Sequence, residues 1–162
     1  VDQIWQDNFG YVKLSFPAFC TLLGENHLKK ICPKSSILLL DSAGDIAGYF
    51  GAYPDWSPLV RNGNPDRISY SEIDYETHFS MLENPVILAK SGGVNPKYRR
   101  SGLYNAMAME LTIRAQDAGY VHAMGCMARE DNFSVKVGRQ TPDGQDMYKE
   151  TRRYALYKKK LA

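Results

Sequence analysis

The residues best suited to bind a ligand form the run Arg99-Arg100-Ser101-Gly102, directly before a stretch with helical apolar spacing. The first four N–H groups of a helix have no partner within the helix and carry the positive end of its dipole. An anion therefore gains several hydrogen bonds there. Glycine lets the anion approach the backbone, and arginine adds charge-assisted hydrogen bonds. The pattern predicts a phosphate or pyrophosphate site at this helix start.

Two common phosphate-binding motifs are absent from the sequence. The P-loop requires G-x-x-x-x-G-K-[ST], and no Lys-Ser or Lys-Thr pair follows a glycine here. The dinucleotide fingerprint G-x-G-x-x-G is missing as well. We therefore expect neither of these nucleotide-binding classes.

A strand and a helix must position the Arg-Arg-Ser-Gly run. Residues 85–94 (PVILAKSGGV) predict a buried strand, and the glycines at its end indicate a bulge or the close approach of another molecule. After Gly102 we predict a helix that ends at Gly119, a suitable residue just past a helix end. Its expected apolar stripe consists of Leu103, Ala106, Met107, Leu111, Ala115 and Ala118.

The rest of the chain predicts further helices and strands around this unit. A helix with Pro17 in its first turn is expected up to about residue 30, weakened by Gly24. Two apolar runs around residues 42–45 predict a hairpin. The expected later elements are a long segment 55–84 with a short helix near 73–81, a strand from 120, a helix from about 131 and a final strand over 152–161. This order predicts an α/β (α+β) fold with a mixed, mostly antiparallel central sheet flanked by helices.

Composition excludes several classes of partner. Hydrophobic residues make up 44% of the 162-residue chain and charged residues 23%, which is ordinary for a globular protein. The longest aliphatic run, residues 37–40, is too short to cross a membrane, and we identify no secretory signal. The net charge of +2 argues against nucleic-acid binding, despite a basic tail at 152–160. The first residue is Val, so the chain can also be a fragment of a longer protein.

The cysteines favour a reducing environment. Cys20, Cys32 and Cys126 are odd in number and show no C-x-x-C spacing. They predict reduced, buried thiols in a cytoplasmic protein, and they argue against a structural metal site.

Residues 94–104 (VNPKYRRSGLY) resemble the pyrophosphate loop of the GNAT N-acetyltransferase superfamily, with the pattern V-x-P-x-[YF]-R-x-x-G-[LI]. The resemblance extends over roughly residues 35–161. It implies a single acetyltransferase-like domain over residues 1–162, or one that lacks the first strand of the fold. A less extensive similarity, in residues 7–19 and 48–58, is to acetyltransferase-like proteins with a degenerate first half, of which this chain would be the C-terminal half.

The resemblance implies acetyl-CoA as co-substrate, no metal, and an amine as acceptor. The pyrophosphate would lie on backbone N–H groups of the loop, and the pantetheine arm along the end of the preceding strand. The Val94 N–H would polarise the thioester carbonyl. The implied cofactor-binding residues are Gly92, Gly93, Val94, Arg99, Arg100, Ser101, Gly102, Leu103, Tyr104 and Asn132.

Catalysis in such enzymes is direct attack of the amine, so we expect a proton acceptor and a proton donor. His78 and Glu130 are the candidate bases, whereas His27 is expected at the surface. The family's usual acid, a Tyr, is replaced here by Gln140, which leaves Tyr148 as a candidate acid.

Tyr104 stands where the family has a small residue, which predicts a tighter helix opening or a shifted cofactor. The resulting prediction is an acyl-CoA-dependent N-acyltransferase, a monomer or a homodimer. The alternative is a non-catalytic CoA-binding or scaffold domain of the same fold.

Overall fold

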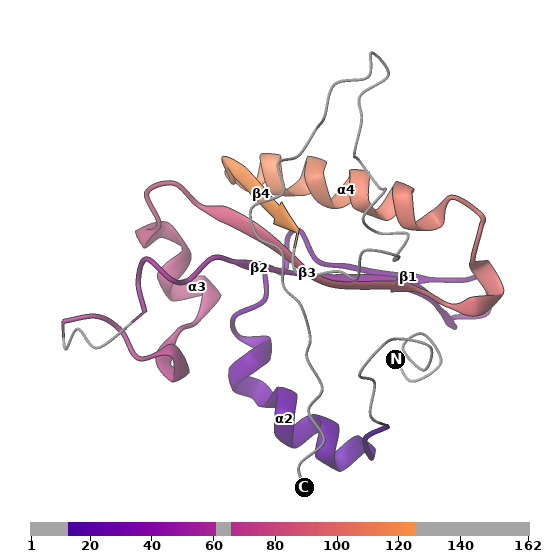
Figure 1. Ribbon diagram of the computed structural model, residues 1–162, viewed down its shortest axis with the longest axis horizontal. Helices are drawn as coiled ribbons and strands as arrows, with labels where there is room; N and C mark the ends of the chain where they lie inside the picture. Colours follow the sequence, from indigo (N-terminus) through magenta and orange to yellow (C-terminus); the bar gives the residue numbers. More distant parts are fainter. Residues whose placement is uncertain (1–12, 61–65, 126–162) are drawn as a thin grey trace, which may run out of the picture. The chain divides into compact units, whose positions relative to one another are not determined.

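The computed structural model describes residues 13–60 and 66–125, and the structural statements below concern these residues. Their centre is a four-stranded sheet with the order β1-β2-β3-β4. Helix α4 lies along one face of the sheet and helix α2 lies on the other side (Figure 1). The predicted sheet flanked by helices is confirmed.

The sheet is mixed and mostly antiparallel, as predicted. Strand β1 (Ile37–Leu40) pairs antiparallel with β2 (Ile46–Pro54), and β2 pairs antiparallel with β3 (Val86–Val94). Strand β4 (His122–Gly125) runs parallel to β3. The β1–β2 pair is the predicted hairpin, and Gly44 in its turn has a φ of 85°, a conformation that favours glycine.

Helix α2 (Phe16–Leu28) precedes the sheet, and Pro17 lies in its first turn as predicted. Gly24 has non-helical dihedral angles, φ 0° and ψ 173°, so the helix is kinked at this residue. The interruption expected from the glycine is thereby confirmed.

The segment between β2 and β3 contains short helical turns, and the short helix predicted near residues 73–81 is confirmed. The turns are η1 (Tyr70–Glu72), α3 (Tyr75–His78) and η2 (Phe79–Met81). The Asp74 side chain caps α3 by accepting hydrogen bonds from the N–H groups of Glu76 and Thr77, at 3.0 and 3.4 Å. The aromatic rings of Trp56, Tyr75 and Phe79 pack together and attach this segment to the core.

Helix α4 (Leu103–Asp117) follows β3 through the short turn η3 (Pro96–Tyr98). Met107, Leu111 and Ala115 are buried against the sheet, as the predicted stripe requires, but Ala106 is exposed. No helix in the described ranges is long and apolar enough to cross a membrane.

The described cysteines are free, but only one of them is buried. Cys32 is fully buried in the core, whereas Cys20 on α2 is exposed. The prediction of a buried thiol is therefore wrong for Cys20, which lies on a helix surface. Cys126 lies outside the described residues.

Candidate functional site

The N-terminus of α4 is open to an anion. Its N-cap is Gly102, in the left-handed conformation with φ 79°, and no side chain caps the helix there. The first helical bond runs from the Ala106 N–H to the Gly102 carbonyl at 3.1 Å, so the N–H groups of residues 103–105 have no acceptor within the helix. A Cβ added to Gly102 would meet no atom within 4 Å. The backbone at the N-cap itself is therefore not covered by a described residue.

The loop before α4 carries backbone strain. Arg100 has a φ of 66°, and it is the one non-glycine residue with positive φ among the described residues. Such a conformation costs about 1–3 kcal/mol and is often found at ligand-binding loops. The left-handed Arg100 and Gly102 flank Ser101, whose hydroxyl donates to the Tyr98 carbonyl at 2.6 Å.

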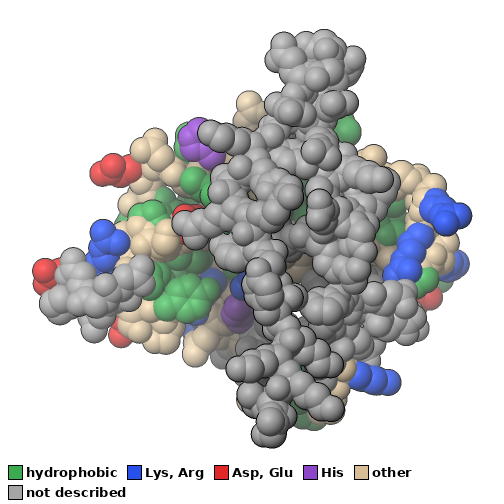
Figure 2. Space-filling model, viewed as in Figure 1, with side chains coloured by type: hydrophobic (Ala, Val, Ile, Leu, Met, Phe, Trp, Pro, Cys, Tyr) green, Lys and Arg blue, Asp and Glu red, His purple; other side chains and the backbone are tan. Residues whose placement is uncertain are grey.

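The surroundings of this helix start are positively charged. Lys97, Arg99 and Arg100 are exposed, and the first turn of α4 has no acidic residue. Figure 2 shows Lys and Arg side chains gathered at the end of the molecule where η3 and the start of α4 lie. Charge and helix dipole therefore favour an anion at the same place.

Tyr104 points its ring toward the sheet. The ring centroid lies 5.0 Å from that of Phe50 on β2. A Cβ on Gly92 would lie 2.5 Å from the Phe50 ring, so glycine at this position makes room for that ring. Tyr104 thus packs on the same layer of side chains that covers Gly92. A ring held against the sheet in this way is compatible with an open helix start.

The end of β3 presents N–H groups on the side away from β2. The Asn95 N–H donates to the Ala47 carbonyl at 2.9 Å, which marks a hydrogen-bonded pair. Val94 opposite Gly48 and Gly92 opposite Phe50 are the non-hydrogen-bonded pairs that alternate with it along the ladder. Since antiparallel pairs alternate, the N–H groups of Val94 and Gly92 face away from β2. Among described residues, pairing of β3 with β4 reaches Ala89 opposite Gly125.

The bulge predicted for the end of β3 lies slightly earlier than the two glycines. The register with β2 shifts between Gly51 opposite Ser91 and Ala52 opposite Ala89, which leaves Lys90 as the extra residue. The Lys90 ammonium lies 5.2 Å from the centroid of the Tyr53 ring, and the His27 ring lies 5.4 Å from the same ring. The bulge therefore lies beside a basic and aromatic group that includes a residue of α2.

His27 belongs to this group and is half-buried rather than fully at the surface. Burial, and then the ammonium groups of Lys90 and Lys30, lower the pKa of His27 below its usual 6.5. The imidazole is therefore neutral at pH 7 and can accept a proton.

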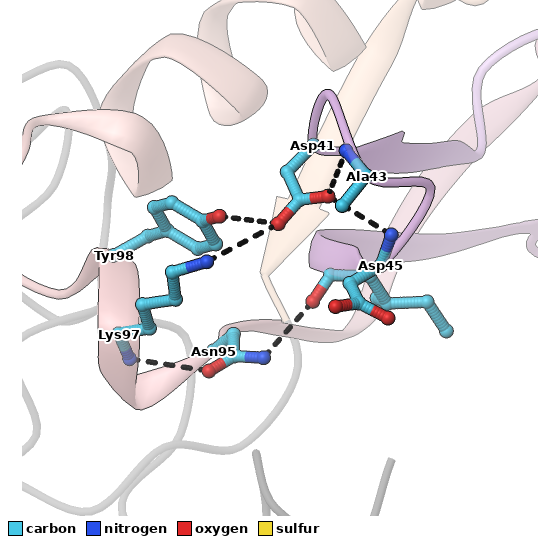
Figure 3. Close-up of polar contacts among 7 residues, drawn as sticks. Asp41, Ala43, Asp45, Asn95, Lys97 and Tyr98 are labelled. Atoms are coloured by element: carbon cyan, nitrogen blue, oxygen red, sulfur yellow. Dashed lines mark hydrogen bonds and ion pairs between the residues drawn. The ribbon is translucent and has the colours of Figure 1, made fainter.

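A carboxylate ties the loop before α4 to the β1–β2 hairpin. Asp41 accepts the N–H groups of Ala43 at 2.8 Å and Asp45 at 3.0 Å, and its other oxygen accepts the Tyr98 hydroxyl at 2.5 Å (Figure 3). The Lys97 ammonium lies 3.5 Å from that second oxygen. The hydrogen bond from Tyr98, then that from the Asp45 N–H, lowers the pKa of Asp41 from 3.8 to about 2. Asp41 is therefore ionised at neutral pH.

The predicted catalytic side chains are only partly described. His78 lies in α3, at the end of the sheet where β2 ends and β3 begins, whereas α4 starts at the other end of β3 (Figure 1). Its Nδ1 lies 3.1 Å from the Asp74 backbone nitrogen and 3.0 Å from the Asp74 carbonyl oxygen. Glu130, Asn132 and Tyr148 lie outside the described residues. Their roles and that of His78 stay predictions.

The structure brings together most of the predicted cofactor-binding residues. Gly92, Gly93 and Val94 end the strand that leads, through η3, to the loop and helix start at residues 99–104. Sequence reasoning missed Asp41 and Phe50, which hold this unit from neighbouring strands. The Asp-Ser-Ala-Gly-Asp turn gave a signal for Asp41 as a turn residue, but no signal for its contact with Tyr98.

No family model and no curated protein matches the sequence. Solved structures do match. The aminoglycoside 6'-N-acetyltransferase AAC(6')-IG from Acinetobacter haemolyticus has a TM-score of 0.54 and 14% identity, over 93% of this chain and 86% of that one. For the aminoglycoside acetyltransferase meta-AAC0020 from an uncultured soil metagenomic sample, in complex with sisomicin, the TM-score is 0.55 and the identity 12%, over 96% of this chain and 81% of that one.

A third similar structure is the aminoglycoside N-acetyltransferase AAC(6')-Iy in complex with CoA. Its TM-score is 0.56 and its identity 16%, over 99% of this chain and 84% of that one. At these identities the likeness defines the fold. The chain has the GNAT acetyltransferase fold, as the sequence predicted.

Proposed function

We propose that this chain is an acyl-CoA-dependent N-acyltransferase that transfers an acetyl group from acetyl-CoA to an amine by direct attack. The observation that carries the proposal is the uncapped start of α4 at the left-handed Gly102, directly after a strand end with outward N–H groups at Gly92 and Val94. This combination in a GNAT fold suits a ligand with an anionic part and an extended amide-containing arm.

The residues of the loop fit the two parts of coenzyme A. The Arg99 N–H already donates to the Pro96 carbonyl at 3.3 Å, so the backbone donors to the pyrophosphate would come from residues 100–104, with the arginine side chains adding charge. The edge of residues 92–94 would hold the pantetheine arm by strand-like hydrogen bonds, with Asn132 beside it. When bound, acetyl-CoA supplies the activated acetyl group as a thioester. The Val94 N–H is the proposed donor to the negative charge that develops on the carbonyl oxygen, and the Gly92 N–H has the same orientation.

Proton transfer is assigned as a proposal to the predicted side chains. An amine acceptor has a pKa near about 10.4, so a base must remove a proton before it attacks. His78 and Glu130 are the proposed bases, and Tyr148 the proposed acid. The neutral His27 beside the β3 bulge adds a further group that can accept a proton.

The proposed acceptor is defined only as an amine. The neighbour with sisomicin in its structure supports an amine-bearing acceptor in general. We also propose a cytoplasmic location, a monomeric or homodimeric state, and no requirement for a metal.

Calorimetric titration with coenzyme A, followed by an assay of free thiol release from acetyl-CoA with a panel of amines, tests the proposal. We expect micromolar binding and amine-dependent thiol release, both lost in Gly102→Val while the protein stays folded. Binding without turnover across the panel would instead support the non-catalytic CoA-binding or scaffold domain. A folded wild-type protein that does not bind coenzyme A would refute both.

A further inference from the structure

We propose that Asp41, at the end of β1, is a positioning residue for the anion-binding loop before α4. Through Tyr98 it holds the loop of residues 99–102 in the conformation that receives the pyrophosphate of coenzyme A. This inference rests on the proposed function. It adds Asp41, which follows β1, to a site otherwise built from the end of β3 and the start of α4.

The carboxylate of Asp41 is itself held in place. One oxygen accepts the N–H groups of Ala43 and Asp45 within the β1–β2 turn, at 2.8 and 3.0 Å. The side chain is 11% exposed. The other oxygen accepts the Tyr98 hydroxyl, so the hairpin turn fixes where the Tyr98 side chain lies (Figure 3).

The turn formed by residues 95–98, which ends at Tyr98, is also bonded to the β1–β2 hairpin at its first residue. The Asn95 side chain donates to the Ile46 carbonyl at 3.1 Å and accepts the Lys97 N–H at 3.1 Å. Residues 95–98 are therefore attached to the β1–β2 hairpin at both ends. A single turn held at two points has little freedom to shift along the sheet.

Tyr98 passes this restraint to the loop that would receive the anion. Its carbonyl accepts the Ser101 hydroxyl at 2.6 Å, and Ser101 lies between the left-handed Arg100 and Gly102. A non-glycine residue stays in the left-handed conformation only when its surroundings determine it. The Asp41–Tyr98–Ser101 series of hydrogen bonds supplies such a restraint from outside the loop.

Charge alone would give Asp41 the opposite effect. A carboxylate near an anion site repels the anion, and the Lys97 ammonium, 3.5 Å from Asp41 and 5.0 Å from the centroid of the Tyr98 ring, offsets part of this charge. Removal of the charge without a positioning role would strengthen coenzyme A binding. Loss of positioning would weaken it. The sign of the change therefore separates the two explanations.

Affinities of the wild type, Asp41→Asn and Tyr98→Phe for coenzyme A and for pantetheine, which lacks the pyrophosphate, test the proposal. We expect coenzyme A binding to weaken about ten-fold in both variants, because each loses one hydrogen bond to a charged group. The affinity for pantetheine should be unchanged. The double variant should bind no worse than either single variant, because both changes break one interaction. The matched control is Asp45→Asn, which removes an equal charge from an exposed side chain of the same turn and should weaken the binding of neither ligand.

If the wild type binds coenzyme A, any one of three results would overturn the positioning role of Asp41. These are tighter binding by Asp41→Asn, an equal loss of coenzyme A and pantetheine affinity, or no change in either variant. Absence of coenzyme A binding in the folded wild type would contradict the proposed function, and this inference with it. Thermal unfolding of each variant establishes that the protein measured is folded.

Discussion

The substitution Gly102→Ala tests whether the start of α4 receives an anion. Gly102 has a φ of 79°, and an L-residue in that conformation costs about 1–2 kcal/mol. In a chain of 162 residues this lowers the melting temperature by roughly 2–8 °C. The new Cβ would meet no described atom within 4 Å, and on the proposed function it would stand in the way of the anion at this helix start. Loss of one charge-assisted hydrogen bond there would weaken coenzyme A binding about ten- to a hundred-fold.

Gly119→Ala is the matched control at the other end of the same helix. Gly119 also has positive φ, 91°, and also has no atom within 4 Å of an added Cβ. It should therefore lose a similar amount of stability but keep its coenzyme A affinity. Thermal unfolding and calorimetry on both variants give the comparison. Equal affinity losses in the two variants, or none in Gly102→Ala, would refute the reasoning that the open space at Gly102 is the anion site.

Three further predictions follow from the same contacts. Arg99→Ala should weaken coenzyme A binding, measured by calorimetry, about ten-fold and reduce the salt dependence of binding. Arg114→Ala, which loses an exposed ion pair near the other end of α4, should change neither quantity. Equal effects of the two substitutions would contradict this. Gly92→Ala should lower the free energy of unfolding, measured in urea, by about 1–3 kcal/mol, because the new Cβ would lie 2.5 Å from the Phe50 ring. Adding Phe50→Leu to this variant should restore part of the lost stability. An unchanged urea midpoint in Gly92→Ala would argue against this packing. The pKa of Asp41 is lowered to about 2, so the ionised carboxylate stabilises the fold above about pH 4 and this contribution is lost as the pH falls toward 2. The difference in melting temperature between the wild type and Asp41→Asn should therefore shrink from about pH 4 to about pH 2. A constant difference would contradict the assignment.

Local sequence patterns predicted most of the fold. The hairpin and the strand β3 have continuous apolar runs, and the helix α4 has a periodic apolar stripe. Each has a glycine or proline at a boundary, and all three were found where expected. The start of α4 directly after Gly102 was also predicted, because its signal lies in adjacent residues. Such features need no knowledge of distant contacts.

Contacts between distant segments could not be predicted in this way. The two glycines at the end of β3 indicated a bulge or a ligand, but the bulge falls at Lys90, and Gly92 accommodates the ring of Phe50 from β2. The direction of the Tyr104 ring also depends on the Phe50 ring, 5.0 Å away between centroids, which the residues around Tyr104 do not reveal. Each of these outcomes is decided by packing across the sheet, which a pattern within one segment does not contain.

The central claim is that coenzyme A lies on the start of α4 and along the end of β3. Backbone amide NMR spectra of the folded protein with increasing coenzyme A test it most directly. The account predicts the largest shifts at residues 99–105 and at Gly92 and Val94, and small shifts at α3, at the other end of β3. An absence of shifts, or shifts confined to residues away from both segments, would contradict it.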